Sequence, residues 1–336
     1  QMKAGFVYSP VSLPGHNAVW FCNTLNFHGE GDYGFFDDAY YRDDLFNPML
    51  EALDSLIPGS IKDVDMMAFF ANHPSKVRSI QFWDFNYYKG ANPGPDEWET
   101  PELRPLESMK TAQKNFRRLI QYLKNREDIE LTTFRELTER FSYQKDEISK
   151  EELGLIAARI LKENKVVADE LFSASEVFSA LAESLDHYHA EQELPMQVKI
   201  RRPFGPLEMP ASNPEIDLVP AGIILEFSGT AQAYIEKTNH LPAFLLYEEK
   251  KIGTGSLLAL FSEMYMKIQD SNLPDHFSTL TFEAYPSVNE ENIISSVAAC
   301  KEWPVHREDL DMSHLIEMTK LQLWTLKPAL EMNEKR

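Results

Sequence analysis

MMAFFANHPSKVRSIQFWDFNYYKGANP, residues 66–93, is the stretch that decides the predicted fold. The apolar run 66–71 has the length and composition of a buried strand, and it brings Asn72, His73 and Pro74 to its C-terminal end. In α/β barrels, functional side chains lie at that end of the strands. We therefore predict an α/β fold containing a partial or distorted (β/α) barrel, with a site where this strand ends.

Composition and charge limit the size of the core and exclude some classes of function. The chain has 336 residues, of which 43% are hydrophobic, so it can bury a substantial core in one large or two smaller domains. Its formal net charge of −20 argues against nucleic-acid binding, because phosphate groups are neutralised by clustered lysine and arginine. No apolar run approaches the length of a membrane span, and no signal-peptide pattern opens the chain. We expect no membrane span, and the localisation is left open between the cytoplasm and the cell wall.

The two cysteines, Cys22 and Cys300, lie nearly the whole chain apart. They form neither a Cys-x-x-Cys motif nor a zinc-finger spacing. Two free thiols, largely buried, are the favoured interpretation, and a disulfide joining two domains is the alternative.

A second strand is predicted over residues 18–27, and it ends in the polar residues His28, Glu30 and Asp32, which are separated by glycines. Residues two apart on an extended backbone project to the same side. These three side chains could therefore converge on a polar ligand or on a divalent metal such as zinc. Polar residues in glycine-rich turns also serve turn chemistry alone, and that is the alternative interpretation.

Aromatic side chains alternate with Asp and Asn after residue 81. Flat aromatic rings stack on the C–H faces of sugars, while carboxylates and amides bind hydroxyl groups. This mixture predicts a carbohydrate-binding groove, although the same residues could simply pack a long loop. The candidate contacts are Trp83, Asp84, Asn86, Tyr87 and Trp98.

Helical periodicity and capping residues predict helices over residues 48–56, 104–125 and 133–141, with a short strand over 129–134 before the last of them. A polar stretch follows, and we place the domain boundary there. The predicted domains are an α/β domain, residues 1–145, and a mainly helical domain, residues 146–336.

One resemblance rests on a series of motifs. A strand ending in His73-Pro74, an aromatic loop, the helix motif FRRLIQYL (116–123) and the segment IELTTFREL (129–137) resemble the last part of a polysaccharide deacetylase domain. That family has a distorted (β/α) barrel, and the resemblance implies that His73 is the general acid that protonates the leaving amine. The family's metal site uses an Asp-Asp pair and a His-x-x-x-His motif. Asp37-Asp38 is superficially similar to the pair, but the chain contains no His-x-x-x-His. An upstream segment, a partner chain or loss of the metal would account for this difference.

An internal repeat occupies the second predicted domain. Residues 156–185 and 230–264 each read as a helix, an Asn turn, an extended piece and a second helix opened by Ser or Thr. The proline-rich stretch 196–220 between the copies is predicted to be an extended crossing segment. The copies resemble pseudomurein-binding repeats, which implies a module associated with a cell wall or glycan. Helical hairpins that only pack on the first domain are the alternative.

The resulting hypothesis is a deacetylase-like hydrolase that acts on or binds an N-acetylated glycan. An activated water would attack the amide carbonyl, and His73 would protonate the amine. The alternative is a non-catalytic glycan-binding or assembly subunit that partners a second protein chain or another copy of itself. A glycosidase using Glu30 and Asp84 is a third reading.

Overall fold

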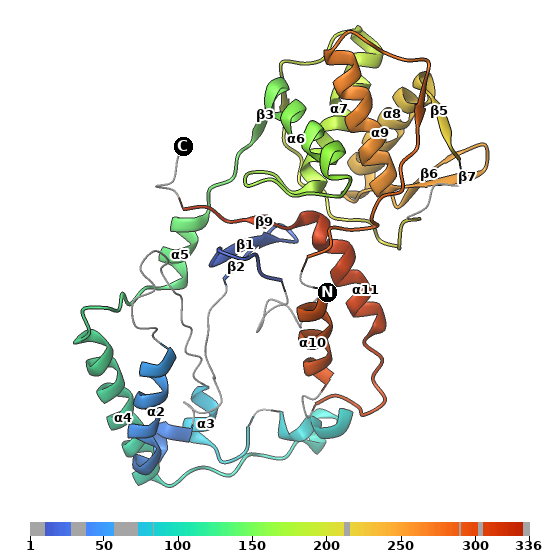
Figure 1. Ribbon diagram of the computed structural model, residues 1–336. Coiled ribbons are helices and arrows are strands. Elements are labelled where there is room, and N and C mark those ends of the chain that lie inside the picture. Colours follow the sequence, from blue (N-terminus) through green and yellow to red (C-terminus); the bar gives the residue numbers. More distant parts are fainter. Residues whose placement is uncertain are drawn as a thin grey trace. The chain divides into compact units, whose positions relative to one another are not determined.

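A computed structural model describes residues 11–27, 38–56, 73–82, 84–211, 216–288, 290–301 and 305–331, apart from the side chains of Pro74 and Cys300 (Figure 1). The chain divides into two compact units, each assembled from separate stretches of sequence. Unit 1 comprises Gln1–Asn26, Arg140–Val297 and Ser313–Arg336, and unit 2 comprises Phe27–Glu139 and Ala298–Met312. The sequence predicts a single boundary at residue 146, whereas both units include segments on either side of that residue.

Unit 1 contains two halves that follow the same path: a short strand, two helices and a strand that pairs antiparallel with the first. The first half consists of β3 (Glu147–Ser149), α6 (Lys150–Glu163), α7 (Ala174–Glu191) and β4 (Gln197–Lys199). The second half consists of β5 (Leu218–Pro220), α8 (Ala221–Thr238), α9 (Thr254–Gln269) and β8 (His276–Ser278). Figure 1 shows the four helices gathered together. The internal repeat is therefore a repeat of structure as well as of sequence.

Backbone hydrogen bonds beside the strands match between the halves. In the first half they run from Lys150 N–H to Met196 O (2.9 Å) and from Ile200 N–H to Asp146 O (2.8 Å). In the second half they run from Ala221 N–H to Asp275 O (2.9 Å) and from Thr279 N–H to Asp217 O (2.9 Å). The strand pair closes each half in the same register.

The predicted Asn turn is present in both halves. Asn164 ends α6 and Asn239 ends α8, both in the left-handed region with φ of 50° and 56°. Asparagine tolerates this conformation better than most residues, because its short polar side chain bonds locally. After the turn the halves differ. The second half contains the hairpin of β6 (Phe244–Tyr247) and β7 (Lys250–Gly253), whereas the first half has an irregular segment, residues 165–172.

The predicted Ser or Thr cap of the second helix holds in one half only. Ser173 forms a capping box with Glu176 at the start of α7, in which the Ser173 N–H donates to Glu176 Oε2 at 2.7 Å. In the other half Gly253 is the N-cap, so the prediction of a Thr cap is wrong there. The Thr254 hydroxyl is instead 2.6 Å from Pro242 O and 3.1 Å from Ala243 O, two carbonyls that follow the Asn turn.

The helices of the two halves pack reciprocally. α6 packs against α9, α7 packs against α8, and α7 and α9 also contact each other. One hydrophobic core runs through both halves and contains Phe178, Phe261, Tyr265 and Trp324, all fully buried. Each half therefore buries its apolar surface mainly against the other half.

A three-stranded sheet with the order β2-β1-β9 also belongs largely to unit 1. The predicted strand over residues 18–27 is wrong as a single element. It forms two strands, β1 (Ala18–Phe21) and β2 (Thr24–Phe27), because Cys22 and Asn23 both take positive φ, 51° and 56°, and reverse the chain. This is the backbone conformation of tight hairpin turns. β9 (Lys327–Pro328) follows α11 (Ser313–Leu321) and the 3-10 helix η4 (Gln322–Thr325), and pairs antiparallel with β1.

A buried ion pair joins β9 to α7. Lys327 Nζ lies 2.8 Å and 2.9 Å from the two carboxylate oxygens of Glu176, and the side chains are only 4% and 2% exposed. Arg202 Nε lies 3.3 Å from the same carboxylate. Burial lowers the pKa of Lys327, and the attraction of Glu176 opposes that shift. The carboxylate that caps α7 is thus neutralised by residues distant in sequence.

Unit 2 is built on two packed helices, α2 (Asp43–Leu56) and α4 (Leu106–Lys124), with α3 (Pro74–Arg78) against α4. Phe46, Met49, Leu53, Leu119 and Leu123 form part of its core. The predicted helices over residues 48–56 and 104–125 are present, although α2 begins earlier, at Asp43.

Two strand predictions of the first domain have different outcomes. The strand predicted over 129–134 is wrong, because these mostly exposed residues pair with no other strand in the described chain and α5 (Phe134–Phe141) begins at their end. The strand predicted over 66–71 lies outside the described residues. The strands that are described form one sheet of three and three sheets of two, none of which closes into a barrel. The structure is mixed α/β and mainly helical.

The remaining elements are the 3-10 helices η2 (Phe85–Gly90) and η3 (Pro95–Glu97) and the helix α10 (Glu290–Lys301). Among the helices that the structure describes, none combines the length and apolar character needed to cross a membrane.

Candidate functional site

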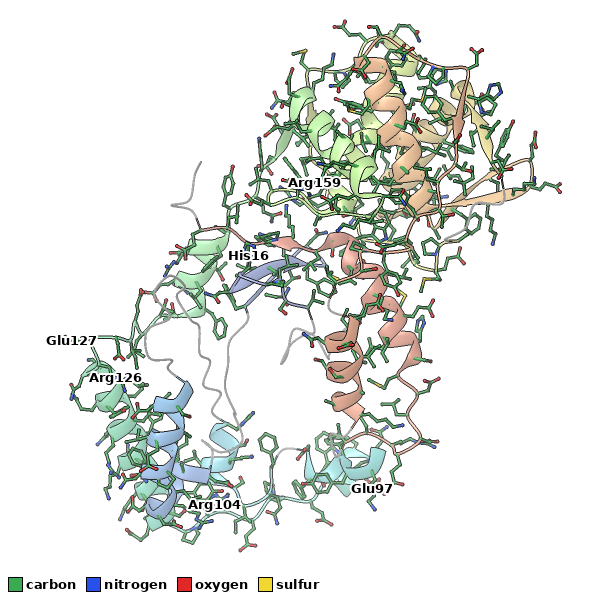
Figure 2. The ribbon with its side chains drawn as sticks, viewed as in Figure 1. His16, Glu97, Arg104, Arg126, Glu127 and Arg159 are labelled. Carbon is green, nitrogen blue, oxygen red and sulfur yellow. The ribbon has the colours of Figure 1, made fainter. Side chains whose placement is uncertain are left out.

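The predicted carbohydrate contacts that the structure describes, Asp84, Asn86, Tyr87 and Trp98, lie on one loop of unit 2 within residues 82–101, and hydrogen bonds close the base of this loop. Ile80 N–H donates to Glu102 O and Arg104 N–H donates to Arg78 O, both at 2.8 Å. The side chain of Arg104, labelled in Figure 2, also holds this base: its Nε donates to Lys76 O at 2.7 Å. The loop is therefore anchored on α3.

The Arg104 guanidinium also lies over the ring of Tyr41, with its Cζ 3.7 Å from the ring centroid. Burial raises the pKa of Tyr41 to about 12, and its hydrogen bond to Asp38 adds to that shift. Tyr41 therefore stays a neutral phenol at physiological pH and packs beneath Arg104 as part of the support.

Two of the candidate contacts support the loop from within. Asn86 Nδ2 donates to Glu99 O at 3.1 Å, and Asn86 Oδ1 accepts from Glu99 N–H at 3.0 Å. Its amide thus joins the two arms of the loop. The side chain of Asp84 is buried, at 3% exposure. The Asp84 side chain is therefore withdrawn from solvent, and the half-buried Asn86 amide is engaged within the loop.

Among the candidate contacts that the structure describes, Trp98 is the most exposed, with 52% of its surface exposed. Its Nε1 donates to Pro93 O at 3.2 Å, and the Tyr87 ring meets it at a T-shaped angle of 68° with centroids 6.5 Å apart. In the neighbouring turn, Glu97 (labelled in Figure 2) caps η3, and its Oε2 accepts the Gly94 N–H at 2.7 Å. The indole is therefore exposed on one side and held in place on the other.

Tyr88 is not among the predicted contacts, and it is 49% exposed. The sequence carries a signal for it, because Tyr88 directly follows Tyr87 and side chains of adjacent residues point in different directions. The backbone leaves the helical conformation at Tyr88, with φ of −55° and ψ of 138°. Tyr88 joins Trp98 as a second exposed aromatic on the loop.

His73, the predicted general acid, lies just before α3 as its N-cap, with extended φ and ψ of −108° and 101°. Its imidazole meets the ring of Phe82 edge-on, with centroids 4.8 Å apart. Lys76 Nζ lies 5.0 Å from the centroid of the same ring. The structure therefore brings His73 to the residue that begins the 82–101 loop.

The predicted metal ligands His28, Glu30 and Asp32 lie outside the described residues, as does Trp83. Across the described ranges, no group of three or more His, Cys, Asp and Glu side chains is arranged to hold a metal ion. Comparison of the chain with protein-family models, with curated proteins and with solved structures finds no match. The loop and His73 are therefore the parts of the predicted site that the structure describes.

The exposed side chains of the loop indicate which kind of ligand it could bind. It presents two exposed aromatic side chains, Tyr88 and Trp98, beside the exposed acidic residues Asp96, Glu97 and Glu99. Aromatic faces bind the C–H surface of a sugar ring, and carboxylates accept hydrogen bonds from hydroxyl or amide N–H groups. Such a surface suits a ligand that carries hydroxyl or amide N–H groups and is not anionic.

Proposed function

We propose that this protein recognises an N-acetylated glycan through the 82–101 loop and serves its deacetylation, in keeping with its resemblance to polysaccharide deacetylases. The observation that supports recognition is the indole of Trp98, which is exposed yet held by Pro93 and Tyr87. A ring that is already fixed loses little conformational entropy when a ligand stacks on it.

The proposed reaction is hydrolysis of an N-acetyl group. Water adds to the amide carbonyl, the C–N bond breaks, and acetate and a free amine are released. His73 would protonate the departing nitrogen as the general acid. Its place beside Phe82, at the start of the loop, supports this role. In this proposal residues 66–71 are the late strand of a distorted (β/α) barrel, and a divalent metal such as zinc would activate the water.

Binding is tested by isothermal titration calorimetry with the hexamer of N-acetylglucosamine. Trp98→Ala should weaken binding about 3- to 10-fold, since an aromatic stacking contact contributes roughly 0.5–1.5 kcal/mol. Tyr234→Ala, at a partly exposed aromatic residue on α8, is the control and should leave the affinity unchanged. Equal affinities of Trp98→Ala and the wild type would refute recognition by the loop.

Catalysis is tested by acetate release from the same hexamer. Loss of release in His73→Ala, with binding retained, is the expected result. Binding without any release of acetate, with and without added Zn²⁺, would instead identify a non-catalytic glycan-binding subunit that works with a separate catalytic chain or with a second copy. New reducing ends without acetate would indicate glycosidase activity.

A further inference from the structure

A segment far along the chain packs on the 82–101 loop. Residues 298–312 belong to unit 2, as the loop does, and Figure 1 shows the described part of this segment, before α11, beside the cyan part of the loop. Gly90 has a positive φ of 75°. A Cβ added there would overlap Arg307 Cγ and would lie 3.3 Å from Arg307 Cδ and from its backbone nitrogen. Arg307 therefore lies directly against the loop, in the room that a glycine leaves.

The guanidinium of Arg307 is both exposed and oriented. Its Nε and Nη2 donate to the two carboxylate oxygens of Asp309, at 2.8 Å and 2.7 Å. The two side chains are 70% and 68% exposed. A guanidinium carries five N–H donors, and this paired contact uses two of them. The other three have no protein partner within the described ranges, so they are available to a ligand.

The same turn of the loop carries an exposed aromatic ring. Tyr88, which is 49% exposed, precedes Gly90 by two residues. Ala91 N–H donates to Tyr88 O at 3.2 Å and closes a tight turn over these four residues. The first and last Cα atoms of such a turn lie less than about 7 Å apart. One turn therefore holds both the exposed phenol ring and the contact with Arg307.

An N-acetylated sugar has two features that these groups match. Its C–H face stacks on an aromatic ring, and its acetamido carbonyl accepts a hydrogen bond. The charged side chains that the loop itself exposes are three carboxylates, which only accept, and Lys89, which forms no ion pair within the part of the chain that the structure describes. Arg307 thus supplies a donor whose direction is already set.

We propose that Arg307 is a substrate-binding residue that distinguishes acetylated from deacetylated sugar. Its Nη1 donates to the acetamido carbonyl oxygen of a sugar that stacks on Tyr88, and Asp309 is the positioning residue that holds the guanidinium. This inference rests on the proposed recognition of a glycan by the loop, and it adds the group that binds the acetyl substituent. Glucosamine, the product of deacetylation, lacks that carbonyl, so Arg307 favours the substrate over the product.

The test is calorimetry on the full chain with two probes, the hexamer of N-acetylglucosamine and the hexamer of glucosamine. Arg307→Ala should weaken binding of the acetylated hexamer about 3- to 10-fold and leave the affinity for the glucosamine hexamer unchanged. Arg307→Lys keeps the charge but lacks the planar paired contact with Asp309, and it should also weaken binding of the acetylated hexamer. Tyr88→Ala should weaken binding of both, because stacking does not depend on the acetyl group.

The matched control is Arg126→Ala. Arg126 forms the same paired contact with the second residue after it, Asp128, at 2.7 Å and 2.6 Å, and Figure 2 shows its label well away from that of Glu97 on the loop. This variant should change neither affinity. If the wild type binds neither hexamer, the glycan proposal and this inference both fail. If Trp98→Ala weakens binding of the acetylated hexamer while Arg307→Ala does not, or if Arg307→Ala weakens binding of both hexamers equally, this inference alone is overturned.

Discussion

In the first half of unit 1 the second helix begins at a buried carboxylate, while in the second half the equivalent helix begins at glycines pressed against backbone. Glu176 caps α7 at 2% exposure and is neutralised by Lys327 and Arg202. At the start of α9, a Cβ on Gly253 would lie 2.0 Å from Ala211 O, and one on Gly255 would lie 2.3 Å from Glu283 O. We call the start of the second helix the joint of each half. The joint is held by a buried ion pair in the first half and by close backbone packing in the second half.

Comparing the two halves shows which features determine the path of the chain. The Asn turn and the matching backbone hydrogen bonds occur in both halves, so they define the path of the chain. The residues that fix the start of the second helix differ between the two halves. A buried charge needs partners, and the first half obtains Lys327 from β9, near the end of the chain. The first half therefore depends on a distant segment for its stability.

The largest expected effect comes from breaking the charged joint. Lys327→Met leaves the Glu176 carboxylate buried without its lysine and should lower the free energy of unfolding by about 3–5 kcal/mol. Urea denaturation followed by circular dichroism measures the change. Lys199→Met, at an exposed lysine on β4, is the control and should stay within about 0.5 kcal/mol of wild type. A loss below about 1 kcal/mol for Lys327→Met would contradict the dependence on β9.

The packed joint should be broken by a single methyl group. Gly255→Ala forces a Cβ against the backbone oxygen of Glu283, and we expect a loss of about 1–3 kcal/mol in the same assay. Gly222→Ala is the matched control, because a Cβ there meets nothing within 4 Å, and it should be neutral or stabilise α8 by up to about 1 kcal/mol. If both variants behave alike, close packing does not fix this joint.

A smaller effect tests the feature that the halves share. Asn164→Ala and Asn239→Ala place a Cβ-bearing residue without a bonding side chain in the left-handed region, and each should cost about 1 kcal/mol. Asn164→Gly and Asn239→Gly should be nearly neutral, since glycine adopts positive φ without strain. Melting temperatures compare the four variants. Unequal costs at the two turns would show that the turns are not equivalent.

The smallest expected effect concerns the reactivity of the Cys22 thiol rather than the free energy of unfolding. Burial raises the pKa of the Cys22 thiol to about 12, so alkylation by iodoacetamide at pH 8 should be slow. Because the folded pKa exceeds the usual value of 9.0, this thiol stabilises the fold below pH 9, and that contribution is lost as the pH rises toward 12.

Cys22 is joined to η4, which directly precedes β9, by the bond from its N–H to Thr325 Oγ1 (2.7 Å), and it reports on that segment. In a Cys300→Ser background, Lys327→Met should accelerate its alkylation, while Gly255→Ala should not. Equal acceleration by both variants would mean that the two joints are not independent.

Local signals in the sequence predicted much of unit 1. Helical periodicity, Asn164, Asn239 and the Ser173 cap were all readable, because they act within a few residues of the chain. The strands β3, β4, β5 and β8 were not predicted. Each has only three residues, and such a strand is stabilised by its distant partner rather than by its own pattern. The hairpin at Cys22 was missed because its turn lacks the Asn-Gly or Asp-Gly pair that marks such turns.

For the candidate sites as well, features formed by residues close in sequence could be predicted, and features formed by distant residues could not. The aromatic loop was readable, since Trp98, Tyr87 and Asn86 lie close together in sequence and meet in one closed loop. That Asn86 and Asp84 support the loop from inside depends on which way each side chain packs, which composition does not reveal. Unit 1 also has a pocket lined by Arg159 and Glu283 among other residues, and it could not be predicted, because separate segments between residues 13 and 328 form its lining.

The reciprocal packing of α6 on α9 and α7 on α8 has a consequence for chains cut between the halves. A fragment holding only β3, α6, α7 and β4 would expose the apolar surface that the second half covers, and the chemically similar surface on another fragment would be the nearest replacement. We expect such fragments to associate in pairs. In the intact chain, the two halves would then correspond to the two subunits of such a dimer, joined covalently. Their sequences and loops could differ, provided that the shared interface is kept.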